Sequence, residues 1–474
     1  MTQIQLPKLR KVDPNKPKKK KILLLSDDLR MHSGIATMSR EIVLQTCKEF
    51  DWVQLAAAVQ HPDQGKILDV SQDIVNQTGV EDAYLKLYPF SGYGTPEVLR
   101  EIINMEKPDA VLHFTDPRFW GWLYGMEHEL RQLMPLFYYT IWDDVPYPRW
   151  NKPFYGSCDL LMCISKQTYN IVKQVLKNTK HEDWQTTYVP HGINENSFYP
   201  IDESHPEWND LQAFRKDLVG DSIDFITFYN ARNIRRKHTS DLILGYKEFC
   251  DKLPKEKADK CLLLMHTEQV DDNGTDLPAV IKELCPYNVK FTSNRIITTK
   301  ELNYLYNISD VTANIASNEG FGLGTAESVM AGTPIVVNVT GGMQDQCGFK
   351  NDEGNYLTEY DYNDEFQTNS VRRYTRHGEW VEPVFPAVRT LQGSPPTPYI
   401  FDDIADYRDC AEALKTWYDR DRNERKRRGK VGREWMLSKE TGLSAESMGE
   451  RFIKDMNTAF ANWTPRVKVE LIKI

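Results

Sequence analysis

Two glutamates separated by seven residues enclose a glycine-rich loop in the second half of the chain, between Glu319 and Glu327. The residues between them are Gly320, Phe321, Gly322, Leu323, Gly324, Thr325 and Ala326. Alternating glycines permit a left-handed backbone and a close approach of the main chain to a ligand. The residues after Leu323 can begin a helix, whose free N–H groups attract phosphate or sugar oxygens. This pattern suits an anionic, hydroxylated ligand.

A basic cluster lies upstream, directly after the apolar run 225–229. Its members are Arg232, Arg235, Arg236 and Lys237. Such a cluster is most often a solvated helix start, but its position at a strand exit favours a binding role. Fixed cations stabilise the negative charge that develops on a departing group such as a diphosphate.

Short apolar runs alternate with stretches of helical period and would position both features. The runs lie at 22–25, 53–59, 110–114, 136–142, 160–164 and 187–189, and again at 225–229, 261–266, 289–292, 311–315 and 335–339. Continuous apolar strands separated by helices indicate parallel sheets covered on both faces. The predicted fold class is α/β, with two tandem Rossmann-like, doubly wound domains that bind ligands at the carboxyl ends of their strands.

The segment from Glu319 to Glu327, with Gly341 and Gly342 beyond it, resembles the Glu-x7-Glu signature of a known family. The family is the retaining nucleotide-sugar glycosyltransferases of the glycogen-synthase-like superfamily, whose architecture is called GT-B. The resemblance implies that Glu319 contacts hydroxyls of the transferred sugar and that Glu327 holds the nucleotide ribose. The alternative is an ordinary loop, helix and strand with solvated glutamates.

The same resemblance implies roles for further residues. Arg232 and Lys237 match the cations that grip the donor diphosphate, and with Glu319 they form the predicted catalytic set. The predicted donor-binding set is Gly34, Arg232, Lys237, Glu319, Gly320, Phe321, Gly322, Leu323 and Glu327. His191 matches a segment that could line the acceptor side of the cleft. Trp142 and Asp143 depart from the family, many members of which carry a His after this strand, but we expect them on the acceptor side too, since tryptophan can stack on a sugar and a carboxylate can bind an acceptor hydroxyl. Two alternatives remain, a structural histidine and a strand-end turn in which Asp143 is an N-cap.

Four segments are predicted. Residues 1–20 are a basic, disordered leader, 21–200 an N-terminal acceptor domain, and 201–435 a C-terminal donor domain with an insertion at about 343–398. Residues 436–474 are helices that, by the resemblance, cross back to the first domain. The insertion could be a lid, an acceptor surface or a subunit contact, and 393–396 is interpreted as the loop at its exit.

Composition and charge narrow the possible classes of protein further. The chain has 474 residues, a formal charge of −9, and 40% hydrophobic residues. No apolar run is long enough for a membrane span and no signal peptide is visible, so a cytoplasmic protein without an integral membrane segment is expected. No Asp-x-Asp follows an apolar strand, so we expect no metal, and no cofactor besides the nucleoside diphosphate sugar that serves as donor substrate.

The predicted function is a retaining glycosyltransferase that moves a sugar from a nucleoside diphosphate donor to a hydroxyl acceptor, with a glycan favoured. One alternative is a catalytically silent sugar-nucleotide-binding or scaffolding protein on the same fold. Another is transfer to a modified nucleic-acid base. The basic leader is the only hint of nucleic acid, and the acidic remainder of the chain opposes it.

Overall fold

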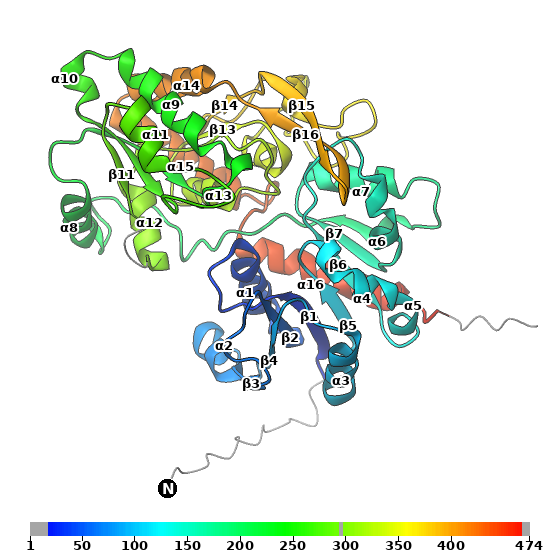
Figure 1. The fold of residues 1–474 in the computed structure, drawn as a ribbon. Coiled ribbons are helices and arrows are strands. Elements are labelled where there is room, and N and C mark those ends of the chain that lie inside the picture. Colours follow the sequence, from blue (N-terminus) through cyan, green and yellow to red (C-terminus); the bar gives the residue numbers. More distant parts are fainter. Residues whose placement is uncertain (1–17, 293–296, 467–474) are drawn as a thin grey trace, which may run out of the picture. The chain divides into compact units, whose positions relative to one another are not determined.

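The protein is described by a computed structural model that covers residues 18–292 and 297–466 and has two compact α/β units (Figure 1). Unit 1 comprises the described residues within 1–139, 157–160 and 449–474, and unit 2 comprises those within 140–156 and 161–448. This division departs from the predicted boundary between 200 and 201. Residues 140–156 and 161–200 belong to unit 2, and the Lys166 amide, for example, donates to Asp345 Oδ2 at 2.9 Å.

Unit 1 is built on a sheet with the strand order β3-β4-β2-β1-β5-β6. All neighbours are parallel except β3 and β4. The strands are β1 Lys20–Asp27, β2 Phe50–Ala58, β3 Leu68–Asp69, β4 Leu85–Ser91, β5 Ala110–His113 and β6 Leu136–Thr140. The run 22–25 in β1 is fully buried, as expected of a strand covered on both faces.

Helices connect these strands. They are α1 Gly34–Thr46, α2 Ser71–Thr78, α3 Pro96–Glu106, α4 Gly121–Gly125 and α5 Glu127–Leu130, with the 3₁₀ segment η1 Pro117–Trp120. Helix α1 begins after Ser33, whose hydroxyl accepts from the Ala36 amide at 3.1 Å, the usual N-cap arrangement. The C-terminal helix α16 is Ala445–Asn462, and from Gly449 onward it belongs to unit 1. There the ring of Phe460 meets Phe137 edge-on with 5.5 Å between centroids.

Unit 2 begins with a smaller group of elements. Strands β7 Leu160–Cys163 and β8 Thr186–Tyr188 pair in parallel, and α7 Lys166–Val175 connects them. The other elements here are α6 Lys152–Gly156, η2 Arg149–Asn151 and η3 Asp183–Gln185. Ser165 caps α7 by accepting from the Thr168 amide at 3.0 Å. The strands predicted from the runs at 160–164 and 187–189 are therefore present.

The main sheet of unit 2 has the order β11-β10-β9-β12-β13-β14, and every neighbouring pair is parallel. The strands are β9 Phe225–Asn230, β10 Cys261–His266, β11 Val289–Phe291, β12 Val311–Asn314, β13 Ile335–Asn338 and β14 Val381–Val384. Read along the chain, this is the doubly wound order in which the connections change direction between β9 and β12. A ligand is expected beyond the carboxyl ends of those two strands.

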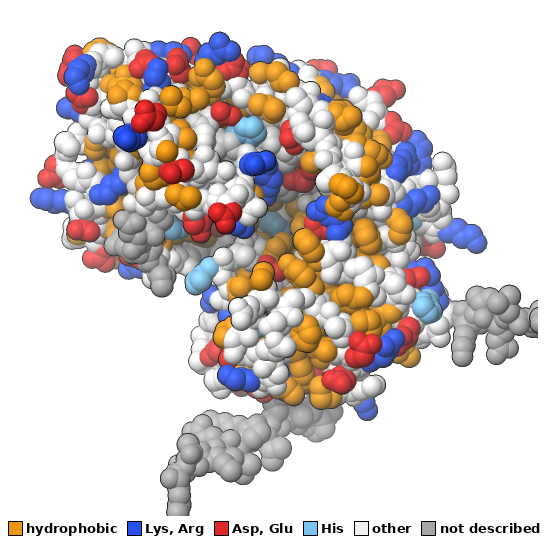
Figure 2. Space-filling view, in the orientation of Figure 1, with side chains coloured by type: hydrophobic (Ala, Val, Ile, Leu, Met, Phe, Trp, Pro, Cys, Tyr) orange, Lys and Arg blue, Asp and Glu red, His pale blue; other side chains and the backbone are white. Residues whose placement is uncertain are grey.

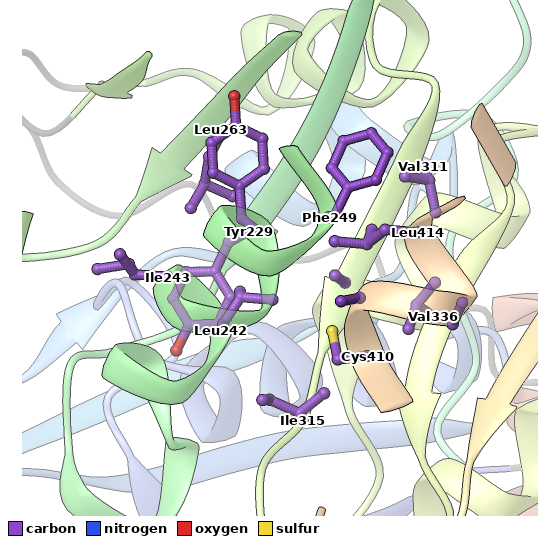
Figure 3. Packing of buried hydrophobic residues seen from close by; sticks show 14 of the residues in the cluster. Tyr229, Leu242, Ile243, Phe249, Leu263, Val311, Ile315, Val336, Cys410 and Leu414 are labelled. Atoms are coloured by element: carbon purple, nitrogen blue, oxygen red, sulfur yellow. The ribbon is translucent and has the colours of Figure 1, made fainter. Parts of the chain in front are cut away.

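The helices of unit 2 lie between and after these strands. They are α8 Trp208–Leu218, α9 Thr239–Asp251, α10 Lys255–Ala258, α11 Leu277–Leu284, α12 Thr299–Ile308, α13 Leu323–Met330, α14 Tyr407–Asp419 and α15 Arg422–Leu437, with η4 Arg235–Lys237, η5 Gly341–Gln346 and η6 Asn369–Val371. Figure 3 shows part of the core that they build with the sheet, where Leu242 of α9 and Leu414 of α14 pack among buried strand residues such as Val311 and Val336.

The predicted insertion is part of the sheet rather than wholly outside it. Its residues 381–384 form β14, which pairs in parallel with β13. The segment 393–396, interpreted as an exit loop, instead lies at the turn of a hairpin made by β15 Val388–Ser394 and β16 Thr397–Ile404. Figure 1 shows this hairpin as a two-stranded ribbon separate from the six-stranded sheet.

Residues 1–17 of the predicted leader lie outside the described part of the chain, but its last residues are structured. Strand β1 already begins at Lys20, and the Lys19 ammonium donates to Asp82 at 2.8 Å. On the face shown in Figure 2, acidic and basic side chains are interspersed. Within the described ranges no helix is both long and apolar enough to cross a membrane.

Candidate functional site

The loops that follow β9 and β12 meet where the second sheet changes direction. Lys237, in the 3₁₀ turn η4 after β9, donates through its ammonium to Glu319 Oε2, which follows β12. Arg236 Nη1 donates to the same oxygen at 3.0 Å. The Lys237 side chain is 8% exposed, whereas that of Arg236 is 44% exposed, so one cation is enclosed and the other reaches solvent.

This arrangement keeps the Glu319 carboxylate ionised. Burial alone would raise its pKa, but the adjacent charges of Lys237 and Arg236 outweigh burial and lower the pKa to about 2. The Glu319 carboxylate thus contacts two cations, while burial lowers the pKa of one of them, Lys237. Such a site can bind an anion and stabilise negative charge on a leaving group.

Arg232 and Arg235 lie differently. Arg232 is 60% exposed, and its Nε donates to Asp271 Oδ2 at 2.7 Å, so its ion pair is not with Glu319. The side chain of Arg235 is exposed, and its backbone amide donates to the Asn273 carbonyl at 3.0 Å. Of the predicted pair Arg232 and Lys237, therefore, only Lys237 contacts Glu319, and Arg236 is the second cation there.

The glycine loop between Glu319 and α13 is held tightly against η5. Gly322 is the N-cap of α13 with φ of 87°, a left-handed value that glycine adopts without strain. The Gly342 amide donates to the Glu319 carbonyl at 2.8 Å, and a Cβ on Gly342 would lie 2.0 Å from the Gly320 carbonyl oxygen. Phe321 is buried, and its carbonyl accepts from Gln346 Nε2 at 2.6 Å. Gly320, Gly322 and Leu323 thus form a fixed turn that presents the first N–H groups of α13.

Glu327 lies one turn into α13 and has a different environment. Its Oε2 accepts from the Tyr306 hydroxyl at 2.7 Å, and that hydroxyl accepts from Asn230 Nδ2 at 2.8 Å. Burial raises the pKa of Glu327 to about 7, against the opposing effect of the Tyr306 hydrogen bond. The two glutamates of the motif therefore differ in charge state near neutral pH. Neither is the solvated side chain of the alternative interpretation, since Glu327 is 9% exposed and the Glu319 side chain 14%.

The loop after β6 contributes two carboxyl groups to unit 2. Burial raises the pKa of Asp143, with the charge of Arg236 opposing and that of Glu319 reinforcing the shift. Asp144 accepts from Asn318 Nδ2, which also donates to the Phe401 carbonyl at 2.8 Å. No described helix begins at Asp143, so the N-cap alternative is wrong. Asn318, which lies in the loop after β12, therefore links that loop to the loop after β6.

Trp142 lies in the same loop and is partly buried. Its indole N–H donates to the Asp144 carbonyl at 2.8 Å, and its ring meets Trp150 edge-on with 5.7 Å between centroids. Trp142 and Asp143 were expected in the first domain, whereas both lie in unit 2. The backbone that follows is anchored there, since the Phe401 amide donates to the Val145 carbonyl at 2.8 Å.

The two remaining predicted residues are His191 and Gly34. His191 is buried in unit 2, with its ring edge-on to Phe321 at 5.2 Å, and burial lowers its pKa to about 3, so the imidazole is neutral. Gly34 is the first residue of α1 in unit 1, next to Ser33, whose hydroxyl donates to Asp27 Oδ2 at 3.0 Å. Its role as a donor-binding residue stays a prediction.

Three residues of this site were not singled out in the sequence as members of it: Asn318, Tyr306 and Asp144. Asn318 precedes Glu319 and Asp144 follows Asp143, so adjacency to a motif residue was the available signal. For Tyr306 there was none, because its position on α12 predicts only a buried face. Among the residues that the structure describes, no group of three or more His, Cys, Asp or Glu side chains is placed to hold a metal ion.

Sequence comparison finds no matching family model and no matching curated protein. Solved structures do match over nearly the whole chain. HepE from Anabaena, in complex with UDP and glucose, is 13% identical with a TM-score of 0.62, covering 93% of this chain and 100% of that one. Sucrose-phosphate synthase from Thermosynechococcus elongatus is 14% identical with a TM-score of 0.64, covering 94% and 100%.

A third match is the α,α-trehalose 6-phosphate synthase from Burkholderia multivorans, 10% identical with a TM-score of 0.56, covering 94% of this chain and 99% of that one. At these identities the similarity concerns the fold. It confirms the predicted fold class, an α/β fold with two Rossmann-like domains, as in these solved structures.

Proposed function

We propose that this protein is a retaining glycosyltransferase that transfers a sugar from a nucleoside diphosphate donor to a hydroxyl acceptor, with a glycan as the favoured acceptor. The observation that carries the proposal is the contact of Lys237 and Arg236 with Glu319 beside the glycine turn of α13. Similar folds that bind such donors include HepE, which also has a complex with UDP-glucose. Uridine nucleotides are therefore the first donors to test.

In this proposal the donor diphosphate lies against Lys237, Arg236 and the N-terminus of α13. As the sugar–phosphate bond breaks, the diphosphate gains negative charge, and both the cations and the helix N–H groups stabilise it. Glu319, ionised and held by the same cations, contacts hydroxyls of the sugar. Glu327 accepts a hydrogen bond from the ribose through its second oxygen.

Retention of configuration follows if the acceptor attacks from the face that the diphosphate leaves. The departing phosphate then takes the acceptor proton, and the protein contributes position and electrostatics rather than a covalent nucleophile. Asp143, whose carboxyl group lies in the electrostatic field of Arg236 and Glu319, is the proposed group that orients the acceptor hydroxyl. Trp142, in the same loop, is proposed to contact the acceptor beside Asp143.

A panel of nucleotide sugars tests this function directly. The purified full-length protein is incubated with UDP-, GDP- and ADP-linked sugars, and released nucleoside diphosphate is measured with and without simple glycans. We expect slow hydrolysis of at least one donor and faster release with an acceptor. Glu319→Gln should fold normally and lose turnover. Tight nucleotide binding without any release would favour the silent sugar-nucleotide-binding alternative instead.

A further inference from the structure

Strand β15 lies within the predicted insertion at about 343–398 and β16 continues beyond it, and the proposed function gives the hairpin β15–β16 no role. It is poorly covered, since most side chains of β15 are exposed and Leu391 is 62% exposed. A two-stranded hairpin is only marginally stable by itself. Its persistence here therefore depends on contacts with the rest of unit 2.

Those contacts lead to the candidate site. The carbonyl of Phe401, in β16, accepts from Asn318, which precedes Glu319. The amide of Phe401 donates to Val145 in the loop that carries Asp143, and Asp403 accepts from Thr340 Oγ1 at 2.9 Å. Strand β16 is thus anchored on the loops that follow β6, β12 and β13. The outer strand β15 and the turn of the hairpin remain exposed beside them.

A row of aromatic rings connects this hairpin with the Asp143 loop. Trp142 meets Trp150 edge-on at 5.7 Å, and Trp150 meets Tyr399 of β16 edge-on at 4.4 Å. The Tyr399 hydroxyl donates to the Tyr147 carbonyl at 3.3 Å. All three rings of the row are partly exposed. The indole N–H of Trp150 has no hydrogen-bond acceptor among the described residues, and a buried donor of this kind is costly.

We propose that Trp142, Trp150 and Tyr399 form an acceptor subsite that binds the sugar unit next to the one that receives the transferred sugar. This rests on the proposed function and deepens it, because it makes the acceptor an oligosaccharide rather than a single sugar. Aromatic faces bind the C–H faces of sugars, and each of the three rings is partly exposed. The hairpin β15–β16 is then the element that selects the acceptor.

Hydrogen-bonding groups favour a glycan at this subsite, although aromatic rows also stack on bases. Carboxyl groups border the row: Asp143 and Asp144 lie in the loop of Trp142, and Asp402 lies in the strand of Tyr399. These three groups interact electrostatically, since Asp144 lies in the field of both others. Burial raises the pKa of all three carboxyl groups, which favours their neutral form and weakens any repulsion of a polyanion, while sugar hydroxyls can donate to the carboxyl oxygens.

The test compares acceptors of increasing length. Full-length protein is given a donor from the panel with glucose, maltose or maltotriose, and with the corresponding mannose and galactose series. The key variant is Tyr399→Leu, which keeps apolar bulk but has no aromatic face. Tyr399→Phe keeps the ring, and Leu391→Ala is a matched control on the neighbouring strand. Circular dichroism and thermal melting check that all variants are folded.

We expect wild-type protein to show a KM about tenfold lower for the disaccharide than for the monosaccharide in one series, the effect of about one stacking contact. Tyr399→Leu should abolish that preference while leaving donor hydrolysis and the monosaccharide KM unchanged. Tyr399→Phe and Leu391→Ala should keep the preference. Equal losses for both acceptor lengths, or no change in Tyr399→Leu, would overturn the subsite.

The proposed function can fail separately, as an absence of nucleoside diphosphate release from every donor. If no transfer is seen, saturation-transfer NMR with the same di- and trisaccharides decides the subsite. Binding to wild-type protein that Tyr399→Leu weakens about tenfold supports it. Equal binding by both proteins, no binding by wild-type protein, or displacement of the sugar by a short oligothymidylate contradicts it.

Discussion

At the scale of single residues, the two glutamates of the motif have opposite electrostatic environments. Despite burial, two cations lower the pKa of Glu319 to about 2. Burial raises the pKa of Glu327, which accepts from a tyrosine hydroxyl, to about 7. The difference arises because α13 carries Glu327 into the interior beside α12, while the loop before α13 leaves Glu319 against η4. Their proposed roles should therefore respond differently to pH.

The first prediction concerns Glu327 and the pH dependence of nucleotide binding. Only the carboxylate form accepts hydrogen bonds with both oxygens, so UDP affinity should rise as pH increases through about 7. The diphosphate also titrates, so the comparison is with Glu327→Gln, which shares that effect but has no carboxylate. Calorimetry at pH 6 and pH 8 should show a larger gain in affinity for wild-type protein. Parallel pH profiles would exclude Glu327 from the nucleotide site.

Folding stability should show the matching trend. The folded-state pKa of Glu327 is raised above its unfolded value, so between roughly pH 4.5 and 7 the folded state retains a proton that the unfolded state loses. The free energy of unfolding of wild-type protein should therefore decrease across this window as pH rises. Glu327→Gln should lack this decrease, which urea denaturation at pH 5 and pH 7.5 would measure.

The second prediction separates two arginines of one loop. The motif points to Arg232, but the ion pair with Glu319 is made by Arg236. Arg236→Ala should weaken binding of UDP by about tenfold or more, since a charge-assisted contact is lost. Arg232→Ala, a matched removal of a cation that pairs with Asp271, should change affinity less. If calorimetry gave the reverse order, the motif alignment would be the better guide.

These arginines also show where sequence reasoning ends. The basic cluster, its place after a strand and the Glu319 motif are visible in the sequence, but the contact between them is not. Which guanidinium faces Glu319 depends on the 3₁₀ turn at 235–237, because successive residues of such a turn point their side chains in different directions. The same limit applies to Asn318 and Tyr306, whose contacts join segments far apart along the chain.

At the scale of elements, strands with uninterrupted apolar runs were predicted well and the others were missed. Strand β10, for example, has the predicted bounds Cys261–His266. Strand β14 reads Val-Glu-Pro-Val, and its proline and glutamate conceal it, although an edge strand tolerates both. The hairpin β15–β16 was missed because β15 is mostly exposed and β16 mostly half-buried, so no continuous buried face marks it in the sequence.

The third prediction concerns the glycine turn packed on η5. A Cβ at Gly342 would lie 2.0 Å from the Gly320 carbonyl oxygen, which is backbone and cannot move without displacing Glu319. Gly342→Ala should cost about 1–3 kcal/mol of stability and abolish donor hydrolysis. Gly156→Ala, in the same unit with open space around it, is the control and should be near neutral. A stable, active Gly342→Ala would mean that η5 does not hold the loop.

At the scale of the whole molecule, two doubly wound units carry the predicted sites on the loops at the carboxyl ends of their strands. The net charge of −9 and the mixed charges on the face in Figure 2 give little attraction for a polyanion. In the proposed function a donor diphosphate is instead attracted locally, by Arg236 and Lys237. Binding of this small anion by an acidic protein would then depend on the two loops after β9 and β12.

That local charge leads to the last prediction, which concerns divalent metals. In many sugar transfers a metal ion neutralises the departing diphosphate, but here two side-chain cations are already fixed beside Glu319 and supply positive charge at that place. We therefore expect donor hydrolysis and transfer to proceed at an unchanged rate after treatment with EDTA. The assay should include a metal-dependent transferase in the same buffer, to prove that chelation is complete. Loss of activity in EDTA that manganese or magnesium restores would show that the two cations are insufficient, and the roles of Lys237 and Arg236 would have to be reassigned.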